Sequence, residues 1–151
     1  MISTTITLAQ FIQAINDTLL MVGVSLIVGA LIGLPLGILL VVTRAGGILE
    51  HKTIYSVLNP IINMVRSLPF IILMVAIIPL TRFIVQTSIG TSAAIVPLII
   101  FIAPFIARLV ENSLLEVNPG IIEAAEAMGA TPFQIIRYFL LPEALSSLVL
   151  S

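Results

Sequence analysis

The chain has 151 residues, of which 60% are hydrophobic and 9% charged, with a formal net charge of −1 and a mean hydropathy of +1.27. A soluble domain carries about 25% charged residues, so this composition excludes a water-exposed globule and indicates an all-α integral membrane protein. The sequence has no basic stripe and no cysteine, which excludes nucleic-acid binding, disulfides and thiolate metal sites.

The first apolar stretch in chain order is residues 19–42, which carry no charged side chain. At ~1.5 Å per residue, a helix over this stretch exceeds the ~30 Å hydrocarbon core of a bilayer and would span it with some tilt. Asp17 and Thr18 are predicted to cap this helix. Residues 1–16 are then predicted to form an amino-terminal segment outside the cytoplasm.

A second span is expected at about residues 61–80 and a third at about 89–107. Arg66 interrupts the second span, and without it the apolar stretch is too short to cross a bilayer. We expect Arg66 near the cytoplasmic end, where its side chain can snorkel as an interface anchor. A buried functional pairing inside the membrane is the alternative. Pro69 is a suitable place for a kink.

The orientation follows from the basic residues in the short loops, because these favour the cytoplasmic side. One side of the membrane would carry Arg44, Lys52, Arg108 and Arg137, and the other only Arg82. This asymmetry predicts a multi-pass protein with its amino terminus outside and everything after the third span in the cytoplasm.

Gly29, Gly33 and Gly37 recur at every fourth residue of the first span. Such a tandem GxxxG ridge lets another helix approach closely in lipid. It predicts helix packing, either an ordinary contact or a tight crossing at a moving interface, and indicates a bundle without specifying an activity.

A charged helix is predicted after the third span. Asn118 can cap a helix whose first residue is Pro119, and Gly129 suits the position just past its end. Two stripes are expected on this helix, one of Ile121, Ala125 and Met128 and another of Glu123 and Glu126. Interfacial helices usually carry Lys and Arg on the polar face, so the acidic stripe favours a protein partner over anionic lipid.

A second helix is predicted directly after the first. Thr131 and Gln134 have the spacing of a capping box, and the helix is expected to end before Pro142. The two helices form a cytoplasmic pair.

These residues resemble a known family. Glu123-Ala124-Ala125, followed by Gly129, Phe139 and Leu141-Pro142, resembles the EAA loop of bacterial ABC importer permeases, with Phe139 where that loop usually has Ile. Further stretches are similar to the methionine-uptake branch of the family: residues 66–73, 90–97, 103–108 and 111–116. The resemblance covers roughly residue 17 to the end.

The resemblance implies an ABC type I importer permease in the bacterial inner membrane, with a transmembrane domain over residues 17–151 and the EAA loop at about 111–142. It implies a homodimer, two copies of an ATP-binding cassette ATPase subunit, and an extracytoplasmic substrate-binding lipoprotein that delivers methionine. The coupling contact with the ATPase would comprise Glu123, Ala124, Ala125 and Gly129, with Leu141 and Pro142 closing the loop.

The chain departs from the family at its carboxyl end. Family members have a five-helix core, whereas only three complete spans precede Ser151. We therefore expect this sequence to be an incomplete permease that ends where a fourth span begins.

No catalytic residue, metal site or cofactor is expected. The chain has no P-loop and its one lysine is Lys52, so ATP hydrolysis would belong to a partner. His51 is expected to be a solvated loop residue, and Asp17 and Glu111 are expected at span ends, which leaves no buried carboxylate for proton or cation coupling. Two alternatives stay open, a permease of this family for another small solute and a membrane assembly protein without transport activity.

Overall fold

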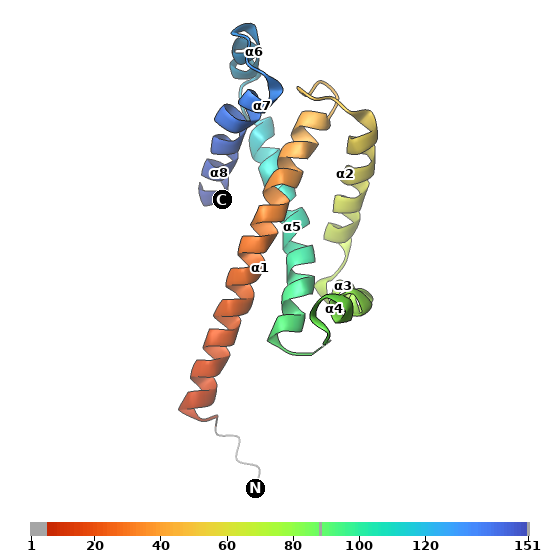
Figure 1. The fold of residues 1–151 in the computed structure, drawn as a ribbon, viewed down its shortest axis with the longest axis vertical. Helices are drawn as coiled ribbons and strands as arrows, with labels where there is room; N and C mark the ends of the chain where they lie inside the picture. Colours follow the sequence, from red (N-terminus) through yellow and green to blue (C-terminus); the bar gives the residue numbers. More distant parts are fainter. Residues whose placement is uncertain (1–5, 88, 151) are drawn as a thin grey trace.

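A computed structural model describes residues 6–87 and 89–150, which are helical with short connections and contain no strand (Figure 1). Two long helices, α1 (Leu8–Thr43) and α5 (Thr91–Leu115), pack against each other and form the centre of the bundle. Both are long and apolar enough to cross a membrane. The all-helical membrane architecture predicted from composition is therefore confirmed.

Helix α1 begins well before the predicted span. Thr7 is its N-cap, and Thr7 and Gln10 form a capping box in which each side chain accepts a hydrogen bond from the other residue's backbone N–H. The predicted cap at Asp17 and Thr18 is wrong, because both residues lie inside the helix and the Thr18 hydroxyl donates to the Ala14 carbonyl at 2.8 Å. The capping box starts the helix earlier than its apolar stretch does.

The second predicted span, residues 61–80, is not one straight helix. The chain forms α2 (Lys52–Ser67) and α3 (Phe70–Ala76), which are bent by 112° relative to each other, followed by α4 (Ile78–Val85). The kink predicted at Pro69 is confirmed. A proline disfavours the helical conformation of the residue before it, and Leu68 is extended, with φ −80° and ψ 136°.

This bend changes the number of spans and the position of Arg66. By length and composition, the described helices include two spans, or three if the bent pair is taken as one, so the predicted number of three requires α2 and α3 to form one span together. Arg66 lies exposed in the last turn of α2, beside the bend and almost the whole helix away from Lys52. Its role as an interface anchor stays a prediction.

The glycine ridge of α1 lies against α5. A Cβ atom on Gly33 would lie 2.6 Å from the Ala103 carbonyl oxygen, and one on Gly37 would lie 2.6 Å from the Ala107 carbonyl oxygen. A Cβ atom on Gly29 would meet the Ile102 side chain at 2.8 Å. Side chains of ordinary size would clash with the α5 backbone at this crossing, so the two helices can only be this close with glycine there.

After α5 the chain forms α6 (Pro119–Ala127), α7 (Pro132–Ile135), the π-helical turn η1 (Ile136–Leu140) and α8 (Leu141–Leu150). The predicted helix end before Pro142 is wrong, since α8 continues through it. In η1 the Leu141 N–H donates to the Ile136 carbonyl, five residues back. This wider turn changes the hydrogen-bond register just before a proline that has no N–H to donate.

One buried cluster joins this carboxyl-terminal part to the two long helices. It contains Ile38 and Val42 from α1, Ile106, Val110 and Leu114 from α5, and Ala125, Ile135, Leu140 and Ala144 from the last four elements. Helix α6 therefore sits on a packed base at the end of the bundle, the same end as the α1–α2 connection (Figure 1).

Candidate functional site

The candidate site is α6 together with the cleft beneath it. The Asn118 side chain caps the helix by accepting a hydrogen bond from the Gly120 N–H at 2.9 Å, and Pro119 occupies the first helical position. These are the residues that the sequence predicted for the start of the helix.

Helix α6 ends in a Schellman motif. The Gly129 N–H donates to the Glu126 carbonyl and the Ala130 N–H to the Ala125 carbonyl, both at 3.0 Å. Gly129 has φ +83°, which glycine adopts without the steric cost that a side chain would add. The predicted position of Gly129 just past the helix end is confirmed, as is the capping box of Thr131 and Gln134 that follows.

The packed face of α6 differs from the predicted apolar stripe. Ala125 is 2% exposed, but Ile121 and Met128 are 47% and 80% exposed. Ile122 packs against the buried cluster in their place. The small Ala125 brings the helix close to its base, and in the preceding turn Ile122 faces inward while Ile121 is exposed; Met128, at the end of the helix, is also exposed.

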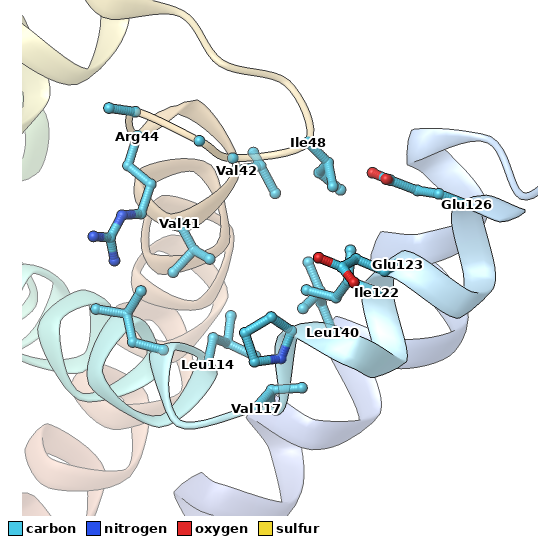
Figure 2. A pocket seen from close by; sticks show the side chains of 15 residues that line it. Val41, Val42, Arg44, Ile48, Leu114, Val117, Ile122, Glu123, Glu126 and Leu140 are labelled. Carbon is cyan, nitrogen blue, oxygen red and sulfur yellow. The ribbon is translucent and has the colours of Figure 1, made fainter.

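A cleft of about 430 Å³ lies between α6, the end of α1 and the loop that follows α1. Glu123 and Glu126 project from α6 toward this cleft, and Arg44 lies across it (Figure 2). Among the described residues, Arg44 makes no ion pair with either glutamate. The cleft therefore has an apolar floor, which includes Val42, and acidic groups on its α6 rim.

The predicted coupling residues fall into two groups. Glu123, Ala124 and Gly129 are exposed on or just after α6, whereas Ala125 is buried in the base. Leu141 and Pro142 begin α8; Leu141 is half-buried against the cluster and Pro142 is exposed. A partner that meets α6 would touch the first group, whereas Ala125 and Leu141 belong to the packed base and Pro142 lies exposed just after them.

A polar cluster at the α2–α5 contact was missed from the sequence. Arg108 forms an ion pair with Glu111, and its Nη2 donates to the side-chain oxygens of Asn59 at 2.9 Å and Asn63 at 2.6 Å. Glu111 is 4% exposed. The expectation that no carboxylate is buried is therefore wrong, because α5 continues beyond the predicted span end and brings both charges inside the bundle.

The spacing of these residues was the available signal. Arg108 and Glu111 are three residues apart, and Asn59 and Asn63 are four apart, so each pair shares a helix face. His51 is exposed and lies outside the helices, as predicted, but it also has a structural role. Its Nδ1 accepts a hydrogen bond from the Ile54 N–H at 3.2 Å, which makes it the N-cap of α2.

The described helices thus form an apolar bundle, with two helices able to cross a membrane, that presents one capped, acidic helix on a packed base. The chain belongs to the family of binding-protein-dependent transport system inner membrane components, whose model matches residues 33–151.

Curated relatives and solved structures agree with this family. The D-methionine transport system permease protein MetI of Salmonella typhi is 57% identical over 138 residues, and that of Escherichia coli K12 is 56% identical. In both cases the match covers 91% of this chain and 64% of the relative's length. The chain thus spans less than two thirds of these relatives.

Among solved structures, an inward-facing form of the MetNI methionine ABC transporter is 53% identical, with a TM-score of 0.89 over 95% of this chain and 68% of that one. An amino acid ABC transporter solved with histidines shares the fold, with a TM-score of 0.65 at 20% identity.

Proposed function

We propose that this chain is the transmembrane permease part of an ATP-driven importer for amino acids, and that its substrate is methionine. The observation that carries the proposal is α6, an exposed and doubly capped acidic helix on an otherwise apolar chain. The substrate rests on the relatives, which are permeases of D-methionine transport systems.

The assembly that we propose contains two copies of this permease and two copies of a separate ATPase subunit, which hydrolyses the ATP. An extracytoplasmic substrate-binding lipoprotein would deliver methionine, and the permease would lie in the lipid of the bacterial inner membrane with its amino terminus outside. The basic residues of the α1–α2 loop and the exposed face of α6 would then lie in the cytoplasm, where an ATPase subunit can reach them.

The contact with the ATPase would be made by the exposed face of α6. Glu123 and Ala124 lie on that face, and Gly129 follows it with no atom near enough to crowd a partner. Ala125 and Leu141 would hold this contact on its base, and Pro142 would close the loop beside them. The acidic rim suits a partner with basic side chains, because opposite charges steer and orient an encounter.

Force on α6 would pass first to α5. Only Glu116, Val117 and Asn118 separate the two helices, and the Val117 N–H donates to the Leu114 carbonyl at 3.2 Å, which tightens the connection. ATP-driven approach of the two ATPase subunits would therefore rock α5, and with it α1, as a packed unit. The substrate path would open to one side of the membrane at a time.

The test reverses both acidic charges with Glu123→Arg and Glu126→Arg in the full-length complex. We expect the ATPase subunit to co-purify poorly and methionine uptake to fall, while the amount of permease in the membrane is unchanged. Glu143→Arg is the matched control, since Glu143 is an exposed glutamate on α8, outside the proposed contact. Full uptake by the α6 variant would refute the coupling role.

The same assay tests the substrate assignment independently of the coupling role of α6. The complex is expected to take up labelled methionine, and an excess of other unlabelled amino acids is expected not to block this uptake. If the complex takes up another labelled amino acid and not labelled methionine, the substrate assignment is wrong but the coupling role of α6 stands.

A further inference from the structure

The polar cluster of Arg108, Glu111, Asn59 and Asn63 has an arrangement that ordinary helix packing does not require. Arg108 and Glu111 are both on α5, so their ion pair by itself joins no helices. The inter-helix bonds are those from Arg108 to the two asparagines of α2. The glutamate holds the guanidinium in place, and the guanidinium reaches across to α2.

This cluster fixes the position of α2 along α5 in a way that the neighbouring apolar contact cannot. Beside it, Ile62 of α2 packs against Ala107 and Leu40. Apolar surfaces can slide with little change in buried area because the hydrophobic effect has no direction. Two charge-assisted hydrogen bonds from one guanidinium have a strict geometry, so a shift by one residue would break both.

The cluster lies where α2 can link the α6 end of the bundle to α3 and α4. Arg108 lies two helical turns before the end of α5, close to where α6 begins. Helix α2 leads through its bend to α3 and α4, which pack on the opposite half of α5, where Phe70 meets Phe101 edge to face at 5.6 Å. The block of α2, α3 and α4 is thus held to α5 at both of its ends.

We propose that Arg108 is a positioning residue which makes α2 move with α5, so that displacement of α6 is passed to the bent pair α2–α3. The link stays formed throughout the transport cycle. Glu111 orients the guanidinium, and the side-chain oxygens of Asn59 and Asn63 accept its hydrogen bonds. This inference rests on the proposed function, since it concerns how force applied at α6 reaches the rest of the permease.

The primary test is the variant Asn59→Leu with Asn63→Leu, which removes the inter-helix bonds and leaves the ion pair on α5 intact. A second variant, Arg108→Met with Glu111→Leu, removes both charges together, because deleting only one would leave the other buried without a partner. Both variants are tested in the full-length complex with its ATPase, and both are expected to hydrolyse ATP. The amount of methionine taken up per ATP is expected to fall about fivefold or more, since about fivefold is the low end of typical coupling between sites.

Asn112→Leu is the matched control, because Asn112 is an exposed asparagine on α5 outside the cluster. It is expected to keep the parental ratio of uptake to hydrolysis. Unchanged ratios in both cluster variants would overturn the proposal.

A covalent replacement of the link distinguishes positioning from mere folding. These 151 residues contain no cysteine, so Asn59→Cys with Arg108→Cys can be joined by a short bifunctional thiol reagent, with the treated parent as control. Glu111→Leu is added to this variant so that no carboxylate is left buried without its partner. Joining α2 to α5 is expected to restore uptake per ATP toward the parental ratio. Lost coupling that the cross-link does not restore overturns the proposal, whereas absence of uptake and ATPase response in the unaltered complex refutes the proposed function itself.

Discussion

At the residue scale, glycine decides how closely the two long helices approach. Gly33 faces the α5 backbone, where a methyl group would lie 2.6 Å from the Ala103 carbonyl oxygen and 2.9 Å from the Ile106 Cβ. Gly23, on the same helix, has no such neighbour within 4 Å. Two glycines of one helix therefore have opposite tolerance for the same substitution.

We expect Gly33→Ala to destabilise the permease by about 1–3 kcal/mol, the usual cost of inserting a methyl group into packed structure. Gly23→Ala is expected to be neutral or slightly stabilising, since alanine is the better helix former. Thermal unfolding of the detergent-solubilised protein measures both. Equal midpoints for the two variants would contradict the close crossing.

At the element scale, short-range signals in the sequence were reliable for α6 and α7, but they misplaced the start of α1 and the helix end before Pro142. The caps of α6 and the capping box of Thr131 depend on residues within one turn, and the structure has them as predicted. Whether residues 61–80 form one straight helix depends on tertiary structure. Their apolar composition suits a straight span, but the Leu68–Pro69 step turns the chain, and α5 supplies a surface on which α3 can pack.

The packing of α6 and the polar cluster could not be read from the sequence for a related reason. Helical periodicity gives the stripes of a helix but not which stripe faces the base, so the sequence predicts Ile121 on the packed face where the structure has Ile122. Arg108 and Glu111 follow an apolar run and so resembled loop residues. Their burial depends on Asn59 and Asn63, which are far away in sequence.

The cap of α6 gives a prediction at this scale. Asn118→Ala removes the acceptor for the Gly120 N–H and is expected to cost about 1 kcal/mol of local stability, whereas Asn118→Asp keeps an acceptor and is expected to restore it. Hydrogen exchange of the α6 amides reports the change, which for alanine is roughly fivefold faster exchange. Protection unchanged by alanine would show that packing on the base, and not the cap, holds this helix.

At the scale of the whole molecule, the bundle has two distinct ends. The loop after α1 and helices α6 and α7 lie at one end, and the start of α1 lies at the other (Figure 1). The predicted orientation places the first end in the cytoplasm. This orientation follows from the basic residues alone, so it calls for a direct measurement.

Single cysteines provide that measurement in a sequence that has none of its own. Phe133→Cys, 74% exposed beside α6, is expected to react with a membrane-impermeant maleimide only after the cells are opened. Leu8→Cys, 74% exposed at the start of α1, is expected to react in intact cells. The reverse pattern would invert the orientation and place α6 out of reach of any ATPase.

The length of α1 restricts how this permease can move. Its 36 residues extend for ~54 Å at ~1.5 Å each, and even a 40° tilt leaves ~41 Å to place in a ~30 Å hydrocarbon layer. The surplus falls on the first turns, whose amide and carboxyl side chains, Gln10, Gln13, Asn16 and Asp17, belong among lipid headgroups. Translation of α1 along its axis would move these polar groups into the hydrocarbon layer, at a cost in free energy. Rotation of α1 about the glycine crossing would leave them among the headgroups. The length of α1 therefore favours rotation over translation.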